Sequence, residues 1–182
     1  MRFILAALAA LSCVFQALPS AHAQDAWPTR NVTIIVPFTA GGTADLFARL
    51  VANHMQQTFG QSFVVENRGG AGGNIGAAAV AKAANDGYTL LLGTVSTHAI
   101  NPTLYKNLTF DAAKDFQPVS LIARLPNMLV VRNALPATNV AEFIAYAKAN
   151  PDKLNYGSSG VGTSIHLAAE LFKIATGTRM TH

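Results

Sequence analysis

The sequence predicts an α/β fold built around a parallel sheet, and three observations lead to this prediction. Short continuous apolar runs alternate along the chain with longer segments in which apolar residues recur at helical spacing. Several apolar runs end in glycine and hydroxyl residues that lead directly into a helix, as strand-to-helix connections do. Of the 182 residues, 51% are hydrophobic and 12% are charged, which excludes a disordered chain.

The first apolar run, residues 32–37, predicts a buried strand, and apolar residues at 3.6 spacing predict a helix over 43–59. Thr43 is the expected N-cap of this helix, and Gly60 is expected to end it. Further strands are predicted at 62–67, 88–93, 119–124, 128–132, 153–157 and from 180 to 182. Further helices are predicted up to residue 84, from a capping box at 139–142 to residue 150, and over 165–175, and residues 94–102 are predicted to turn toward a short helix.

Residues 1–23 have the order of a secretory signal peptide. A basic Arg2 precedes an apolar core, and an Ala-His-Ala sequence ends at Ala23, where we expect cleavage. The alternative is a membrane anchor, but the apolar run 3–18 is shorter than the ~20 residues that a spanning helix needs. Cys13 lies inside this segment, so the mature chain is expected to contain no thiol or disulfide and to be located in the periplasm.

The charge pattern and the motifs exclude several classes of function. The net charge of +4 is dispersed, without the basic patch of a nucleic-acid-binding protein. No lysine follows Gly41 and Gly42 as a phosphate loop requires, and the glycine spacing of a dinucleotide fold is absent. The histidines and carboxylates do not occur at the spacing of metal ligands. We therefore expect neither a cofactor nor a metal.

Four turns share one composition: a buried strand ends in small residues and hydroxyls at 37–43, 69–76, 93–97 and 157–164. In a parallel sheet such turns lie at one edge, where ligands bind. A helix that begins there offers unpaired N–H groups and about half a positive charge, which together can hold an anion without arginine. The alternative is that each turn is only a tight connection.

The candidate ligand-binding residues belong to these turns or to the first turn of the helices that follow them. They are Phe38, Thr39, Ala40, Gly41, Gly42, Thr43, Asp45, Ser96, Thr97, Ser158, Ser159, Thr163, Ser164 and His166. Two interpretations of Asp45 are open: complement of the helix dipole, or partner for a ligand hydroxyl or amine.

A second class of function, an α/β hydrolase-like enzyme, would use Ser158 or Ser159 with His166. The nucleophile motif G-x-S-x-G is incomplete, however, because Val161 stands where its last glycine is required. We therefore assign no catalytic residue.

Five segments carry a resemblance to a known family: WPTRNVTIIVPFTAGGTAD (27–45), VVENRGGAGGNIGA (64–77), DGYTLLLG (86–93), HAINP (98–102) and LNYGSSGVGTSIHL (154–167). In this order they resemble the tripartite tricarboxylate transporter receptor family, the Bug-type periplasmic solute-binding proteins. The resemblance implies a Venus-flytrap fold, like type II periplasmic binding proteins, in which two α/β lobes close around a small carboxylate. It also implies that main-chain N–H groups and ordered waters at turns 37–43 and 158–164 hold that carboxylate.

The same resemblance implies the partners and the domain boundaries. The partners would be an organic anion and the membrane permease subunits of the transporter, the receptor itself being a monomer; a sensory role would use the same pocket. Residues 24–125 would form lobe one without its C-terminal return, and residues 126–182 part of lobe two. Family members run past residue 182, so the chain is expected to be a fragment that binds a carboxylate weakly or not at all.

Overall fold

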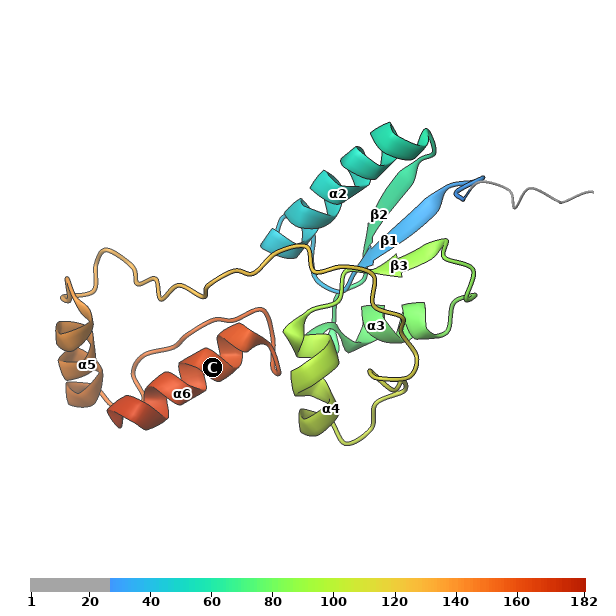
Figure 1. Cartoon of the computed structure of the whole chain (residues 1–182). Helices are drawn as coiled ribbons and strands as arrows, with labels where there is room; N and C mark the ends of the chain where they lie inside the picture. Colours follow the sequence, from blue (N-terminus) through green and yellow to red (C-terminus); the bar gives the residue numbers. More distant parts are fainter. Residues whose placement is uncertain (1–26) are drawn as a thin grey trace, which may run out of the picture.

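The structure is a computed structural model that describes residues 27–182 (Figure 1). The predicted signal peptide lies outside the described residues. The elements, in chain order, are β1 (Val32–Val36), α2 (Thr43–Phe59), β2 (Phe63–Asn67), the 3-10 helix η1 (Ala71–Gly73), α3 (Asn74–Ala81), β3 (Thr89–Leu91), the π-helix η2 (Ser96–Ile100), α4 (Asn101–Leu104), α5 (Val140–Ala149) and α6 (Ser164–Thr176).

The core of the chain is a three-stranded parallel sheet in the order β2-β1-β3. Its central strand is buried from Ile34 to Val36, as predicted for a strand covered on both faces. Figure 1 shows α2 and α3 on opposite sides of this sheet. Ala48 and Ala52 of α2 pack on β1 together with Phe63 of β2. The three strands predicted between residues 32 and 93 are therefore confirmed, with slightly shorter bounds.

Glycines and short polar side chains set the ends of the helices. Helix α2 spans the predicted residues and ends at Gly60, which has the left-handed conformation (φ 71°). Its N-cap is Gly42 rather than the predicted Thr43, which is already the first helical residue. Helix α5 has the predicted cap, because Asn139 Oδ1 accepts a hydrogen bond from the Glu142 N–H at 3.0 Å.

The strands predicted at 119–124 and 128–132 are wrong. The structure has no regular element between Leu104 and Val140, and apolar side chains there are exposed, including Val119 (87%), Met128 (82%) and Val130 (79%). A strand needs a neighbour to pair its backbone groups, and none of the described segments supplies one to these residues. The strands predicted at 153–157 and 180–182 pair only with each other and are reduced to a single parallel bridge between Asn155 and Thr181.

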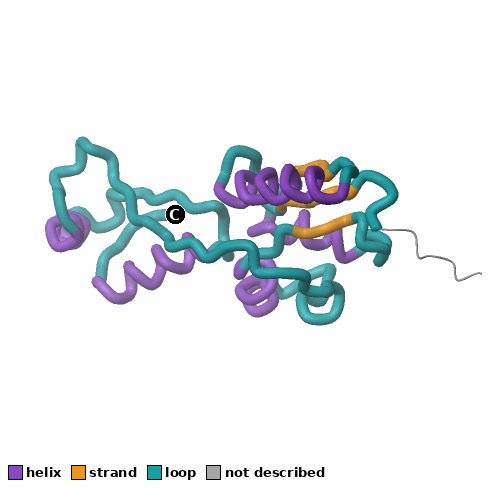
Figure 2. The backbone as a smooth tube through the Cα atoms, turned by 45° about the horizontal axis from the view of Figure 1, so that its top comes forward, coloured by secondary structure: helices purple, strands orange, loops and turns teal. Residues whose placement is uncertain are grey.

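The chain therefore has two ordered regions joined by a long loop. The first region is residues 27–115 and contains the sheet; the second is residues 140–182 and contains α5 and α6. Figure 2 shows the loop running from the sheet region to α5.

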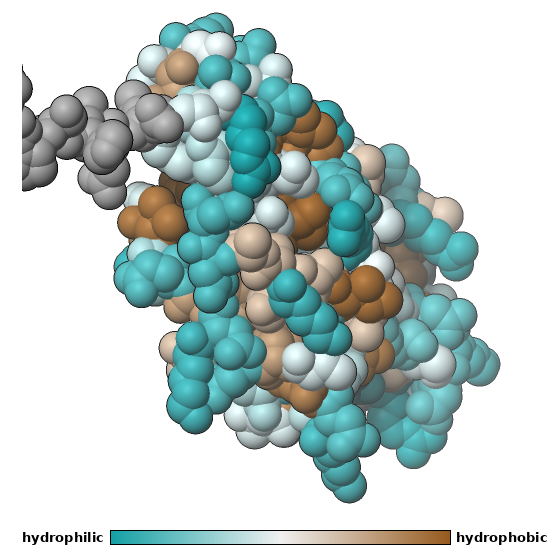
Figure 3. Space-filling model, turned by 90° about the vertical axis from the view of Figure 1, so that its right-hand side faces the viewer, coloured by the Kyte–Doolittle hydropathy of each residue, from teal (hydrophilic) through white to brown (hydrophobic). Residues whose placement is uncertain are grey.

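Figure 3, a view of one end of the molecule, shows hydrophobic residues in separate patches among polar ones. In the part of the chain that the structure describes, no helix has the length and hydropathy needed to cross a membrane. The lobe boundary at residue 125 stays a prediction.

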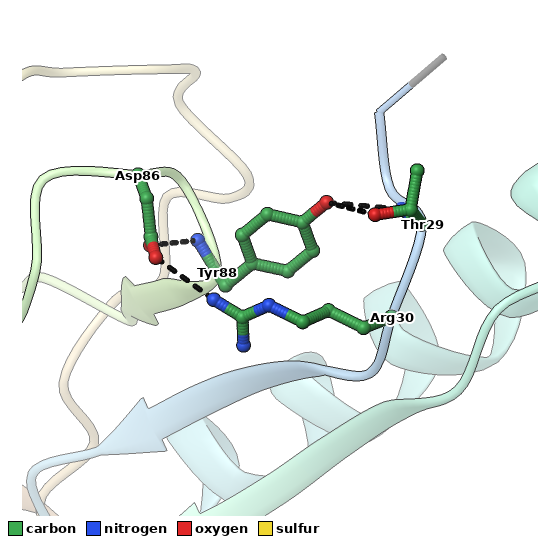
Figure 4. A network of polar contacts seen from close by, with 4 residues as sticks. All are labelled: Thr29, Arg30, Asp86 and Tyr88. Carbon is green, nitrogen blue, oxygen red and sulfur yellow. Dashed lines mark hydrogen bonds and ion pairs between the residues drawn. The ribbon is translucent and has the colours of Figure 1, made fainter. Parts of the chain in front are cut away.

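A polar network joins the amino-terminal ends of β1 and β3, away from the glycine turns (Figure 4). The Arg30 guanidinium lies 3.8 Å from the centre of the Tyr88 ring and 2.8 Å from Asp86. The Thr29 hydroxyl lies 3.0 Å from the Tyr88 hydroxyl, and the Thr29 N–H donates to the same hydroxyl at 2.9 Å. These two hydrogen bonds, the side-chain one first, lower the pKa of Tyr88. The network fixes how the chain leads into the central strand.

The cap of α5 provides a test of the fold. Replacing Asn139 with alanine removes the acceptor for the Glu142 N–H, so the free energy of unfolding should fall by about 1 kcal/mol in a denaturant titration. Asn139→Asp keeps an acceptor and should cost much less. Equal losses for the two variants would contradict the assigned cap.

Candidate functional site

The first three turns follow β1, β2 and β3 at the carboxyl-terminal edge of the sheet, as the sequence predicts, and the fourth turn, which follows no strand of this sheet, contacts the second turn. A Cβ atom placed on Gly69 would lie 3.3 Å from the Thr39 nitrogen, and one on Gly73 would lie 2.8 Å from Thr97 Cγ2. A Cβ atom on Gly72 would lie 2.5 Å from the carbonyl oxygen of Val161 in the second region. The second turn thus contacts each of the other three turns, and the close approach requires glycine.

The first turn presents its backbone to solvent. Residues 39–43 are exposed, and Phe38 behind them is half-buried, with its carbonyl oxygen accepting a hydrogen bond from Asn67 Nδ2 at 3.2 Å. No side chain caps α2, whose N-cap is a glycine. The first N–H groups of α2 therefore lie beside an exposed loop, where an anion can reach them.

Asp45 stabilises this turn through its side-chain hydrogen bonds. It is 5% exposed, and its Oδ2 atom accepts hydrogen bonds from the Gly41 N–H at 2.9 Å and from Arg49 Nε at 3.1 Å. The Arg49 hydrogen bond, followed by the Gly41 N–H, lowers the pKa of Asp45 from 3.8 to about 2. The carboxylate thus satisfies one loop N–H and pairs with a cation on its own helix, which favours the structural interpretation of Asp45.

The third turn contributes support rather than exposed donors. Thr97 is fully buried; its hydroxyl donates to the Thr94 carbonyl at 3.1 Å and lies 2.8 Å from His98 Nδ1. Ser96, in the same π-helix, is also buried. Burial lowers the pKa of His98, whose ring lies against Gly93. The structure places Ser96 and Thr97 at the carboxyl-terminal edge of the sheet, as predicted, but both are buried beneath the surface of the protein.

The fourth turn is held by its own hydroxyl groups. Thr163 caps α6 by accepting a hydrogen bond from the His166 N–H at 3.3 Å, and its hydroxyl donates to the Gly160 carbonyl at 2.7 Å. Ser158 Oγ accepts a hydrogen bond from the Gly160 N–H at 3.1 Å. Ser159 is exposed and Ser164, the first residue of α6, is half-buried.

The histidine beside Ser158 is not the one that the hydrolase alternative requires. Ser158 Oγ lies 2.8 Å from Nε2 of His182, whereas His166 contacts His182 ring to ring, with centroids 4.6 Å apart. None of the described carboxylates bonds to either histidine ring.

Behind this turn, Tyr156 donates a hydrogen bond to Glu170 of α6. Burial, followed by this carboxylate, raises the pKa of Tyr156 to about 12. Lys173 neutralises the same carboxylate at 2.9 Å. The segment before the fourth turn is thus attached to the helix that follows the turn.

Sequence reasoning missed two residues that join these turns, Asn101 and Tyr105. Asn101, fully buried, donates from Nδ2 to the Gly72 carbonyl at 2.9 Å and to Asn74 Oδ1 at 2.6 Å. Tyr105 donates to the Val161 carbonyl at 2.9 Å. The only sign of Asn101 in the sequence was its place in HAINP, which carried the family resemblance but no assigned role.

Two hollows accompany the turns. One, of about 450 Å³, lies between α3 and residues 105–109. The other, of about 680 Å³, is mostly apolar and lies between residues 127–132 and α6, reaching Gly157 at the fourth turn. Among the described residues, no group of three or more potential ligands is placed to hold a metal ion.

Gly76 tests the packing of the turns. A Cβ atom there would lie 2.8 Å from both Pro37 Cα and the Arg68 carbonyl oxygen. Gly76→Ala should therefore lower the free energy of unfolding by about 1–3 kcal/mol, although alanine normally favours a helix. Gly157→Ala, where nothing lies within 4 Å, is the matched control and should be near neutral. A stabilising Gly76→Ala would contradict this packing.

Asp45 provides a test by pH. Its lowered pKa means that its stabilisation is complete above the unfolded value of 3.8 and disappears as the pH falls through about 2. Between pH 4 and 2, the free energy of unfolding should therefore fall more steeply for the unsubstituted chain than for Asp45→Asn. Arg49→Gln removes the main cause of the shift and should reduce this difference. If the free energy of unfolding depended on pH in the same way for the unsubstituted chain and for Asp45→Asn, the Asp45 carboxylate would not stabilise the turn.

Comparisons with known proteins give a consistent result. Residues 47–182 match the tripartite tricarboxylate transporter family receptor, TctC. A UPF0065 protein of Bordetella pertussis is 43% identical over 169 residues, which are 93% of this chain and 52% of the relative. The chain thus spans about half the length of the curated relatives it matches.

Two solved structures show the same fold with a bound carboxylate. R. palustris Rpa4515 with adipate is 51% identical, with a TM-score of 0.83 over 85% of this chain and 52% of that chain. MatC (Rpa3494) from Rhodopseudomonas palustris with bound malate is 37% identical, with a TM-score of 0.79 over 85% and 53% of the two chains. The α/β fold of this chain is therefore that of about half of a periplasmic binding protein.

Proposed function

The chain belongs to the tripartite tricarboxylate transporter receptor family, and from this premise we propose that it captures a small organic carboxylate in the periplasm. It would deliver this ligand to the membrane permease subunits of a tripartite transporter. The single observation that carries the proposal is the exposed, uncapped amino end of α2, beside which the other glycine turns converge.

The chemistry of this edge suits a carboxylate. Unpaired N–H groups at the start of α2 and the helix dipole favour a negative charge. Arg49, the cation on the first turns of α2, is already paired with Asp45, with Nη2 and Oδ1 3.0 Å apart. The ligand would thus be held by neutral donors and a dipole, which suits a receptor that must release it.

The ligand class follows from the two carboxylate-bound relatives, one titled with adipate and one with malate. Both are short aliphatic dicarboxylates. We propose the same class for this chain, with the first turn holding one carboxylate and residues 158–164 lining the opposite side. Phe38 and Thr39, in the first turn, would then contribute to selectivity.

Binding without turnover is part of the proposal. Ser158 Oγ is engaged by the Gly160 N–H and by His182, and no described carboxylate orients either His182 or His166. Such an arrangement supports a turn rather than an activated nucleophile. Ester hydrolysis by the purified protein, abolished by Ser158→Ala or Ser159→Ala, would instead establish the hydrolase alternative.

Gly42 offers a direct test of the anion site. Its backbone (φ −81°, ψ 172°) accepts any residue, and a Cβ atom there would be no closer than 3.7 Å to Thr39 O. Gly42→Asp should cap α2 and raise the melting temperature, yet abolish carboxylate binding because its own carboxylate occupies the site. Binding of adipate is measured by calorimetry in a chimaera that adds the part of the adipate-bound relative outside the match.

The control for this experiment is Gly42→Asn, which also caps the helix but carries no charge. It should weaken binding less than Gly42→Asp does. If Gly42→Asp bound adipate as tightly as the unsubstituted protein, the carboxylate would not bind at the start of α2, and the proposed site would be wrong.

Because the chain spans about half the length of its relatives, adipate binding is measured both on the chain alone and on a longer chimaera. We expect adipate to bind residues 27–182 weakly or not at all. A chimaera that adds the part of the adipate-bound relative outside the match should bind it measurably. Submicromolar binding by the chain alone would contradict the first expectation, and a folded chimaera that binds no dicarboxylate would contradict the proposed ligand class.

A further inference from the structure

The first and second regions meet at α4. Asn101 begins this short helix and Tyr105 follows its last residue, so the two side chains lie one helical turn apart on one side. The Tyr105 hydroxyl donates to the Val161 carbonyl in the fourth turn at 2.9 Å. Fifty-six residues separate the two groups in the chain, so this hydrogen bond joins the two regions.

On both sides of this contact, only glycine leaves enough room. A Cβ atom on Gly72 would lie 2.5 Å from the Val161 carbonyl oxygen and 3.1 Å from the Tyr105 hydroxyl. A Cβ atom on Gly162 would lie 2.6 Å from Asn101 Oδ1. Both glycines have positive φ values, 64° and 85°. The backbones of the second and fourth turns therefore approach each other without side chains between them.

Asn101 fixes the first region's side of this contact. Its Nδ2 atom donates to the Gly72 carbonyl and to Asn74 Oδ1, which holds η1 and the start of α3 in place. Its own Oδ1 atom is buried beneath Gly162 and has no hydrogen-bond partner among the described residues. Withdrawal of the fourth turn would expose this oxygen to water, so the contact costs desolvation that the Tyr105 hydrogen bond offsets.

We propose that Asn101 and Tyr105 are positioning residues that hold the fourth turn against the second turn and, through the contact of Gly69 with Thr39, set its distance from the first turn. Asn101 holds the second turn (residues 69–76), and Tyr105 holds the fourth turn against it. Neither residue contacts the ligand. This inference rests on the proposed function in one respect, that the first and fourth turns bind the carboxylate.

Spin labels on the two regions test the mechanical part of the proposal. The chain is labelled at Gln56→Cys on α2 and Lys148→Cys on α5, both exposed positions, with Cys13→Ser so that only these sites react. Pulsed electron paramagnetic resonance then measures the distribution of distances between the labels. Tyr105→Phe, which removes one oxygen atom, should at least double the width of this distribution.

The matched control is Tyr146→Phe in α5, because the side-chain hydrogen bond that involves Tyr146 among the described residues uses its carbonyl oxygen, which accepts from Asn150 Nδ2, and not its hydroxyl. It should leave the width unchanged. Gly162→Ala, which forces a Cβ atom against Asn101 Oδ1, should broaden the distribution as Tyr105→Phe does. An unchanged width for both Tyr105→Phe and Gly162→Ala would overturn the proposal.

The binding part is measured separately in the chimaera described above. Tyr105→Phe should weaken adipate binding about fivefold to tenfold, the effect of one net hydrogen bond, while Tyr146→Phe should not. If the unsubstituted chimaera bound no carboxylate, the proposed function would fail while the distance measurement still decided the role of Tyr105. Broadened distances with unchanged affinity would show that Tyr105 orients the regions but not the site.

Discussion

The parallel pairing of β1 with β2 on one side and β3 on the other is the constraint on which the rest of the structure depends. Parallel pairing directs the carboxyl ends of all three strands to one edge. The turns that follow them, although far apart in the sequence, must therefore meet there. Hydrophobic burial of Ile34, Ile35 and Val36 holds this arrangement, and the polar network around Tyr88 secures its opposite end.

Once the turns are at one edge, the size of their residues decides how closely they approach. Gly72, Gly73 and Gly76 each lie where a Cβ atom would contact another turn within 3 Å. The glycines thus serve packing at least as much as ligand contact. The hydroxyl residues fall into two groups. Thr97 and Thr163 donate hydrogen bonds to backbone carbonyls of their own turns and so support them, whereas Thr39 and Thr43 are exposed.

The sequence was sufficient to predict the elements whose local pattern agrees with their burial in the structure. The central strand and α2 were predicted nearly residue by residue, since a buried apolar run and a helix ended by Gly60 are local signals. The strands at 119–132 were not, because apolar β-branched residues do not show whether a partner strand is present. Asn101 and Tyr105 were missed because their partners, Gly72 and Val161, become neighbours only after folding. The role of Asp45 was left open for a similar reason, since the two hydrogen bonds that favour a structural role form only after folding.

The central claim is that the first and fourth turns form one carboxylate site. Backbone amide NMR measures it in the chimaera that adds the part of the adipate-bound relative outside the match. As adipate is added, the amide signals of residues 42–45 and 158–164 should shift together along one saturation curve, while uncharged adipamide leaves them in place. Shifts confined to one of the two turns, or centred on the hollow between α3 and residues 105–109, would contradict the claim.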